Sequence, residues 1–88
     1  MKNPDETVVL MKNYGKVSLK LDKLIDERGI TRNHLAQMIH TRFEVVNKWY
    51  HNNVDTVDLD ILARICFVLQ CQIGDILEYD KTSTEANR

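Results

Sequence analysis

The sequence predicts an all-α fold, a compact bundle of five helices in one domain. Apolar residues recur three and four positions apart over most of residues 19–77, which is the spacing of one helix face. The 88 residues, 43% of them hydrophobic, can form one modest core but not two. No internal repeat or low-complexity tract divides the chain, so we expect a single helical unit.

Residues 1–15 are predicted to form a flexible or strand-like arm ahead of the domain. They contain the only proline of the chain and no helical stripe. A short apolar run, TVVLM at residues 7–11, could pair as an edge strand. The helical domain is therefore expected to span residues 16–80.

A first helix is predicted over about residues 19–28. Alternate apolar residues from Val17 to Leu21 have the spacing of a strand. Leu21, Leu24 and Ile25, however, have the spacing of a helix face, and three charged residues follow them. The helix is the favoured interpretation of this segment.

Two short helices joined by a tight corner are predicted within residues 31–52. Thr31 can cap a helix that begins at Arg32, and Gly29 ends the helix before it. Two apolar stripes follow, separated by three residues. They consist of Leu35, Ala36 and Ile39, then of Val45, Val46, Trp49 and Tyr50. Ala36 is small enough to let the second helix approach closely, and so short a corner makes the two helices cross steeply.

Two further helices and a polar tail complete the prediction. Residues 51–58, HNNVDTVD, are rich in turn formers, and Thr56 or Asp58 can cap the next helix. Its predicted core face consists of Leu59, Leu62, Ala63, Cys66 and Leu69. A last short helix around residues 74–77 would close the core together with Ile73, Ile76 and Leu77. Residues 81–88, KTSTEANR, are polar and are predicted to be a disordered tail.

Several classes of protein are not expected. There is no signal peptide and no apolar run near the roughly 20 residues that span a bilayer, so Cys66 and Cys71 are expected to be free thiols of a cytoplasmic protein. Their C-x4-C spacing differs from the usual C-x2-C zinc pattern, so no metal site is expected. Glycine-rich phosphate loops, Gly-x-Ser-x-Gly elbows and paired carboxylates are missing. We therefore expect no enzyme, no cofactor, no small-molecule substrate and no membrane partner.

Charge is distributed unevenly along the chain. The net charge of −1 argues weakly against nucleic acid, since phosphate contacts depend on Lys and Arg. Residues 16–51, however, hold seven basic residues against four acidic ones, whereas residues 54–80 hold one against six. One part of the molecule could therefore face DNA and the other could not.

The corner at residues 31–52, with its Leu35-Ala36 pair, and the later motif ICFVLQCQIGDILEY resemble the Cro and phage-repressor type of helix-turn-helix. The resemblance is to the Xre-like family of small bacterial transcriptional regulators and covers roughly residues 19–79. It implies a lambda-repressor-like DNA-binding domain whose second corner helix, around residues 42–50, lies in the major groove. The family usually has glycine at the corner where this chain has His40, so we expect a distorted corner or a longer helix there.

The exposed side of this second helix supplies the candidate DNA contacts, because Arg and Asn suit base edges and Lys suits phosphates. The predicted base contacts are Arg42, Phe43, Glu44 and Asn47. The predicted phosphate contacts are Thr31, Arg32, Lys48, His51 and Asn52. The alternative is that these polar residues are only the solvated face of an amphipathic helix.

Two of these side chains have competing interpretations. Phe43 could press on a thymine methyl group, or it could fold back beside Arg32 and Ala36. Glu44 could accept from a cytosine amino group, or it could form an ion pair with Lys48 four residues on. The ion pair is favoured because phosphates would repel the carboxylate.

The resulting hypothesis is a sequence-specific transcriptional regulator, a repressor, that binds double-stranded DNA. One such module reads only a few base pairs, so a homodimer on a palindromic operator is expected. The acidic C-terminal part, together with TVVLM, is the candidate dimer surface. The alternative is a protein-interaction module on the same fold, such as an antitoxin-like or bridging factor, that uses the exposed face of Phe43 and Tyr50.

Overall fold

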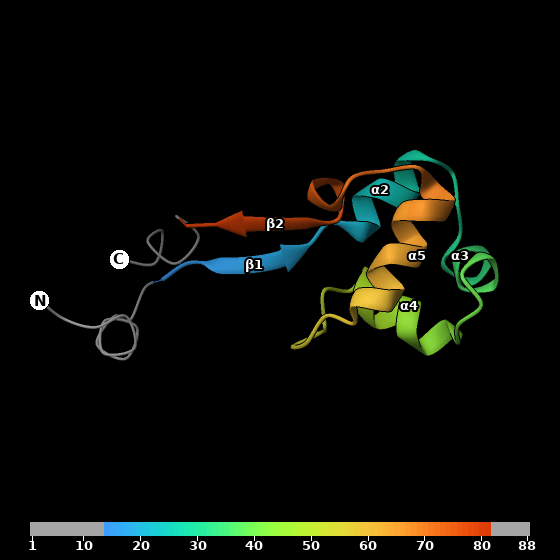
Figure 1. Ribbon diagram of the computed structural model, residues 1–88, viewed down its shortest axis with the longest axis horizontal. Coiled ribbons are helices and arrows are strands. Elements are labelled where there is room, and N and C mark those ends of the chain that lie inside the picture. The colour runs from blue at the N-terminus through green and yellow to red at the C-terminus, as the bar shows by residue number, and fades with distance from the viewer. Residues whose placement is uncertain (1–13, 82–88) are drawn as a thin grey trace, which may run out of the picture.

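The computed structural model describes residues 14–81, which form a helical body and a small antiparallel ribbon (Figure 1). In chain order the elements are β1 (Lys16–Leu19), α2 (Leu21–Glu27), α3 (Arg32–Met38), α4 (Phe43–Tyr50), α5 (Leu59–Leu69), the 3-10 helix η1 (Ile73–Asp75) and β2 (Leu77–Asp80). The four α-helices pack together, and the two strands project from one end of them. The predicted TVVLM strand and nearly all of the predicted arm and tail lie outside the described residues.

The strands correct two of the five predicted helices. The first helix begins at Leu21, because Lys16–Leu19 forms β1 and pairs with β2 in a register that places Val17 opposite Tyr79 and Leu19 opposite Leu77. The predicted last helix is a single turn of 3-10 helix that leads into β2. Strand formation here depends on a partner about 60 residues away, so local helix spacing could not reveal it. The fold is mostly helical, with four α-helices and one two-stranded sheet in the described part.

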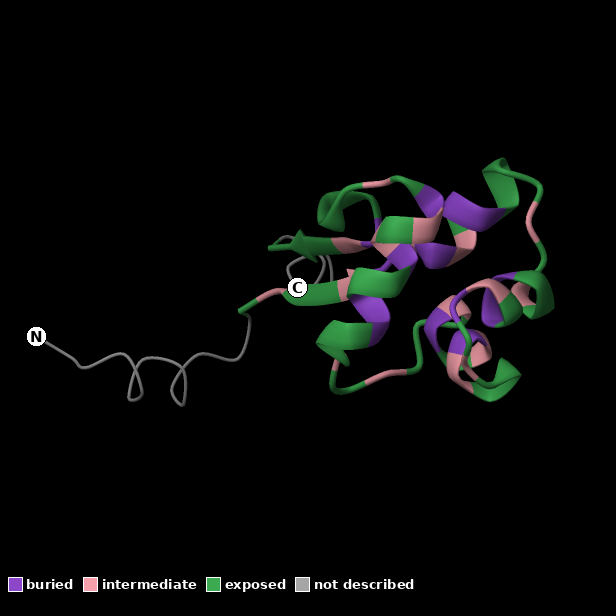
Figure 2. Ribbon diagram, turned by 45° about the vertical axis from the view of Figure 1, so that its right-hand side comes forward, coloured by how far each residue is buried: buried purple, intermediate pink, exposed green. Residues whose placement is uncertain are grey.

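The core lies where the inward faces of the four helices meet, and the ribbon contributes only its base (Figure 2). The largest fully buried side chains are Leu21, Ile25, Leu35, Val46, Ile65 and Ile76. Each such side chain is worth about 2 kcal/mol of transfer free energy when it leaves water. Trp49 is buried as predicted, at 4% exposure.

The buried face of α5 differs from the prediction. Leu59 is 76% exposed and Ala63 is also exposed, whereas both were expected in the core. The residues that α5 buries are Ile61, Leu62, Ile65 and Leu69. Because α5 is apolar on nearly every side, its spacing fits more than one face. Of the residues predicted to close the core at this end, Ile73 is likewise 57% exposed, whereas Ile76 is fully buried as predicted.

Each α-helix is followed by a residue in the left-handed conformation, and only one of the four is glycine. These residues are Gly29, His40, Asn52 and Gln70. After α2, the N–H of Gly29 donates to Asp26 O at 3.2 Å and the N–H of Ile30 donates to Ile25 O at 2.9 Å. This pair of bonds is the Schellman arrangement, which satisfies carbonyls that would otherwise lack a partner at the helix end. Gly29 therefore ends α2, as predicted.

Glycine is required at the start of β1. Gly15 has φ +89°, and a Cβ atom placed on it would lie 2.6 Å from the hydroxyl oxygen of Tyr79. That hydroxyl donates to Tyr14 O at 2.7 Å, which ties the chain before β1 to β2. Glycine at this position thus avoids backbone strain at positive φ and leaves room for the Tyr79 ring in its present place.

Candidate nucleic-acid interface

The first corner helix begins as the sequence predicts. The Thr31 backbone is extended, and its side-chain oxygen accepts from the backbone N–H of His34 at 3.0 Å. Satisfying a free amide in the first turn fixes the start of α3 at Arg32. Arg32 is therefore the first residue of α3, and its guanidinium extends toward α4.

The corner itself is a helix end of the same Schellman type, with His40 in the glycine position. His40 has φ 57°, its N–H donates to Gln37 O at 3.2 Å, and the N–H of Thr41 donates to Ala36 O at 3.0 Å. The expected longer helix is therefore wrong. Histidine takes the left-handed conformation that glycine would occupy more cheaply.

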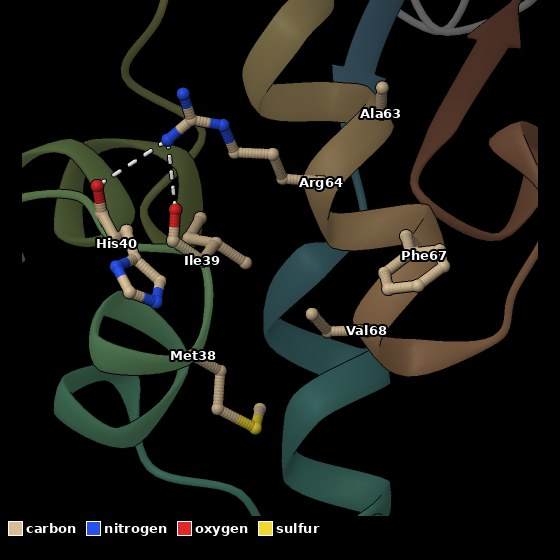
Figure 3. Close-up of a pocket in the computed structure, with 7 residues that line it drawn as sticks. All are labelled: Met38, Ile39, His40, Ala63, Arg64, Phe67 and Val68. Atoms are coloured by element: carbon tan, nitrogen blue, oxygen red, sulfur yellow. Dashed lines mark hydrogen bonds between the residues drawn. The ribbon is translucent and has the colours of Figure 1, made fainter.

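Arg64 of α5 holds this corner from the other side. Its Nη1 donates to Ile39 O at 2.9 Å and to His40 O at 3.4 Å, and Figure 3 shows the guanidinium reaching across to both carbonyls. Charge-assisted bonds of this kind offset the lost helix bonds of the α3 carbonyls. The angle between α3 and α4 is thus set by close packing at Ala36, which is 2% exposed, and by this contact from α5.

Arg32 gathers four side chains of α4 and its C-terminal end into one group, which we call the Arg32 cluster. Its Nη1 donates to Asn47 Oδ1 at 2.7 Å and lies 3.3 Å from His51 Nε2. The guanidinium carbon lies 4.7 Å from the ring centre of Tyr50 and 5.8 Å from that of Phe43, so both contacts are cation–π contacts. Guanidinium has only donors, so Arg32 donates to the amide oxygen of Asn47, which accepts.

Tyr50 connects this cluster to α2. Its hydroxyl donates to both carboxylate oxygens of Asp26, at 3.0 and 3.2 Å. This hydrogen bond is the main reason why the pKa of Tyr50 is raised above its ordinary value. The sequence analysis placed Tyr50 in the apolar stripe of the second corner helix and assigned Asp26 no role. No local signal could have paired them, because 24 residues separate the two.

The structure also bears on the two side chains with competing interpretations. Phe43 is 41% exposed and lies beside Arg32, so part of its ring remains open to solvent. The predicted ion pair between Glu44 and Lys48 does not form, since within residues 14–81 the one ion pair joins Arg64 and Asp60. An exposed pair on a helix gains too little Coulomb energy to hold two long side chains in place.

The remaining predicted DNA contacts differ in whether their side chains already have a partner within the protein. Arg42 precedes α4, and Lys48 lies in its last turn; both are exposed and form no side-chain hydrogen bond or ion pair within the described residues. The side chain of Asn52, in contrast, already has a hydrogen-bond partner. Its Oδ1 accepts from the N–H of Leu19 at 2.8 Å, and its left-handed backbone ends α4. This residue holds β1 onto the helical body.

The two thiols are free and lie near each other on the acidic side of the molecule. Burial, reinforced by neighbouring Cys66, raises the pKa of Cys71 to about 11. No group of three or more His, Cys, Asp or Glu residues within the described part of the chain could hold a metal ion. Among the helices of residues 14–81, none is long and apolar enough to cross a membrane.

Comparison with known proteins gives two findings. The sequence profile of the Cro/C1-type HTH DNA-binding domain matches residues 20–82. The fold is similar to a crystal structure of a candidate DNA-binding protein from Bacteroides fragilis, with a TM-score of 0.64 and 16% sequence identity over 72% of this chain and 100% of that one. Among curated proteins, none matches the chain significantly.

Proposed function

This protein belongs to the family of Cro/C1-type helix-turn-helix DNA-binding domains, and on that premise we propose that it is a sequence-specific transcriptional regulator, a repressor in the cytoplasm. In this proposal α4 lies in the major groove of double-stranded DNA. The protein acts by binding alone, without catalysis or a cofactor. The alternative that α4 presents only a solvated polar face does not account for the contacts described next.

The observation that carries the proposal is the bond from Arg32 to Asn47. With Oδ1 of Asn47 held at 2.7 Å, the amide is fixed in one orientation and its NH2 group points away from Arg32. The NH2 group is then available to an acceptor on a base edge, such as purine N7 or guanine O6. A solvated side chain would gain nothing from being held this way, whereas a base contact gains from the lost freedom.

Around this contact we place the other predicted residues in the roles that their surroundings support. Arg42 is free to reach a base edge, and Phe43 keeps enough open ring to contact a thymine methyl group. Without an ion pair, Glu44 remains available to a cytosine amino group. The remaining predicted phosphate contacts are Thr31, Arg32, Lys48, His51 and Asn52. Of these, Asn52 accepts from the N–H of Leu19 through its Oδ1, so only its NH2 group is left to donate to a phosphate.

Specificity requires a second module. One α4 helix contacts about one half-site, so two copies related by a two-fold axis would bind a palindromic operator. Residues 54–80, with one basic residue against six acidic ones, would face away from DNA. Repression follows where such an operator overlaps a promoter.

The test is selection of binding sites from randomised duplex DNA, repeated at two salt concentrations. Wild-type protein should enrich a palindromic sequence, and its affinity should fall as salt rises. The double variant Asn47→Ala, Lys48→Ala should enrich nothing. The matched control is Lys23→Ala, which removes the same charge from an exposed position of α2 and should enrich the same sequence as wild type.

A protein-interaction module is the competing function. It would use Phe43 and Tyr50, although the guanidinium of Arg32 covers one side of both rings. Under that alternative, Phe43→Ala would matter most and salt would matter little, because the binding energy would come from apolar contact. Failure of the wild type to enrich any sequence would favour this alternative.

A further inference from the structure

The pair formed by Arg32 and Asn47 presents hydrogen-bond donors at its outward edge. Nη1 of Arg32 donates to Asn47 Oδ1 at 2.7 Å, so the amide turns its oxygen toward α3 and its NH2 group the other way. The opposite orientation of the amide would set NH2 against a guanidinium that has no acceptor. A ligand that approaches this edge therefore meets N–H groups.

The oxygen of this amide is a poor acceptor for a second partner. An amide oxygen has two lone pairs, and Arg32 already uses one of them. The other lies beside the guanidinium charge, which repels the hydrogens of any further donor. Both side chains are half-buried, so water and salt screen this repulsion less than at an open surface. A base that must donate to Asn47 is therefore disfavoured.

Aromatic rings hold the guanidinium in place. Its carbon lies 4.7 Å from the ring centre of Tyr50 and 5.8 Å from that of Phe43. The hydroxyl of Tyr50 donates in turn to the carboxylate of Asp26, which fixes that ring from α2. Cation–π contacts of this kind favour one position of the planar group. The amide of Asn47 consequently keeps one orientation before DNA is bound, which lowers the entropy cost of a base contact.

We propose that Arg32 makes this site specific for guanine, and that adenine is rejected at the base pair opposite Asn47. This inference deepens the proposed function, on which it rests, by naming the base. In the major groove guanine presents two adjacent acceptors, N7 and O6, whereas adenine presents N7 beside the donor N6. The NH2 group of Asn47 donates to guanine O6. Adenine would set its own amino group against that NH2.

An asparagine without Arg32 beside it would have the opposite preference. Its amide suits adenine, because the oxygen accepts from N6 while the NH2 group donates to N7. That pairing needs the oxygen that Arg32 occupies in this protein. Arg32 belongs to α3 and lies 15 residues before Asn47, so a residue outside α4 decides what α4 reads. Arg32 is thus a positioning residue, and its other N–H groups remain available to a phosphate.

The pyrimidines fit the donor edge less well than guanine does. Cytosine offers its N4 amino group, which is a donor and would face the NH2 group of Asn47. Thymine offers the single acceptor O4, with a methyl group beside it. Guanine is therefore the base whose major-groove edge consists of acceptors alone.

The first experiment finds the base that Asn47 reads. A site is selected from randomised duplex DNA with wild type, and fluorescence anisotropy then measures wild type and Asn47→Ala on that site with each base pair replaced in turn. The position at which Asn47→Ala loses its preference is the one opposite Asn47. Wild type should prefer guanine to adenine there by about tenfold. A preference for adenine would overturn the proposal.

Inosine at the same position shows which groove is read. Paired with cytosine, it keeps N7 and O6 in the major groove and lacks the minor-groove amino group of guanine. Wild type should therefore bind the inosine site within about twofold of the guanine site. A loss as large as that caused by adenine would place the contact in the minor groove and would contradict the proposal.

The second experiment removes the guanidinium. Arg32→Leu frees Oδ1 of Asn47, so the preference should change from guanine to adenine, by about threefold or more in the ratio of affinities. Arg32→Lys keeps a positive donor beside Oδ1 and should retain guanine. The matched control, Lys48→Ala, removes a charge from α4 and should weaken both sites without changing their ratio. Low salt keeps the weaker variants measurable. Undiminished preference for guanine in Arg32→Leu would refute the role of Arg32.

Asn47→Asp is an independent test that leaves Arg32 in place and preserves the shape of the side chain. One carboxylate oxygen accepts from Arg32, and the other replaces the outward NH2 group by an acceptor. Guanine should then be rejected and cytosine preferred, because a carboxylate accepts from cytosine N4. Circular dichroism confirms that each variant is folded. An unchanged preference for guanine would mean that the NH2 group does not face the base.

Failure of this inference can be told apart from failure of the proposed function. If wild type selects a sequence and Asn47→Ala loses the preference at one position, reading of DNA by α4 stands. Adenine at that position, or guanine that survives Arg32→Leu, then counts against the role of Arg32 alone. Selection of no sequence by wild type would overturn both.

Discussion

The outward faces of α4 and α5 differ in polarity, although both helices bury an apolar face in the same core. Around α4 the exposed side chains are mostly polar, and the one large apolar side chain, Phe43, is partly covered by Arg32. Along α5 the exposed ridge is Leu59, Ala63 and Phe67. A face with fixed polar groups suits a polyanion, and a bare apolar face suits protein. The two helices of one small domain thus present chemically different outward faces, a polar one on α4 and an apolar one on α5.

The largest expected effect is charge reversal on α4. Lys48→Glu should raise the dissociation constant for operator DNA about 100-fold, because each of two copies loses a phosphate contact and gains a repulsion. Fluorescence anisotropy at several salt concentrations should also show a shallower salt dependence. Lys16→Glu on β1 makes the same change in net charge and should alter the affinity less than about threefold. Equal losses in both variants would mean that only net charge matters, and the comparison of the two faces would fail.

The next largest effect is expected at Asn52, the residue that joins the end of α4 to the ribbon. Asn52→Ala should lower the free energy of unfolding by about 2 kcal/mol, because alanine tolerates φ 57° poorly and the N–H of Leu19 loses its acceptor. Urea denaturation measures this loss. Asn53→Ala, one residue further on and exposed, is the control and should change stability by less than about 0.5 kcal/mol. A much smaller loss of unfolding free energy in Asn52→Ala would show that β1 is held by its pairing with β2 instead.

The N-cap residues of α3 and α5 allow a matched pair of substitutions, one beside the predicted DNA interface and one away from it. Thr31→Ala at α3 and Asp58→Ala at α5 should each cost about 1 kcal/mol of stability, since each side chain accepts from backbone N–H groups in the first turn. Only Thr31→Ala should also weaken DNA binding. Thermal melting and anisotropy on the same samples separate the two effects, and equal DNA affinity in both variants would remove Thr31 from the interface.

A smaller effect is expected from the thiol at the end of α5. Because the pKa of Cys71 is raised to about 11 from an ordinary 9.0, the unfolded chain loses this proton first as pH rises. The contribution of the thiol to stability is therefore full below pH 9 and is lost between pH 9 and about 11. Solvent screening limits it to about 1 kcal/mol or less, as Cys71 is only half-buried. Urea melts at pH 8 and pH 10.5 should show a larger drop for wild type than for Cys71→Ala.

The smallest effect concerns the corner. His40→Gly should stabilise the fold by about 0.5 kcal/mol, the relief of left-handed strain being partly offset by the greater freedom of glycine in the unfolded chain. DNA binding should persist, since His40 belongs to no predicted contact. A clear fall in melting temperature would show that the imidazole itself stabilises the corner.

Local chemistry in the sequence was enough to predict much of the helical part. Thr31 caps the helix that it was expected to cap, Asp58 is the one of two predicted candidates that caps α5, and Gly29 ends α2. Each of these outcomes depends on residues within five positions of one another. The spacing of apolar residues likewise predicted the buried positions of Leu35 and Trp49.

The same reasoning was wrong wherever the deciding partner lay far along the chain. The strand at residues 16–19 exists because β2 pairs with it, and the exposure of Leu59 depends on which face of α5 the other helices cover. The ion pair from Glu44 to Lys48 failed for the opposite reason, because a local rule carried too little energy.

What the sequence by itself determined is therefore the set of helices that local caps and apolar spacing specify, together with the family signature. The tertiary structure alone decided the ribbon, the bare face of α5 and the Arg32 cluster, in which Arg32 meets Asn47 15 residues away and Tyr50 meets Asp26 24 residues away. The physical reason is that helix periodicity and capping are set by near neighbours. Burial, strand pairing and the orientation of an interface side chain are set by whatever the folded chain brings alongside.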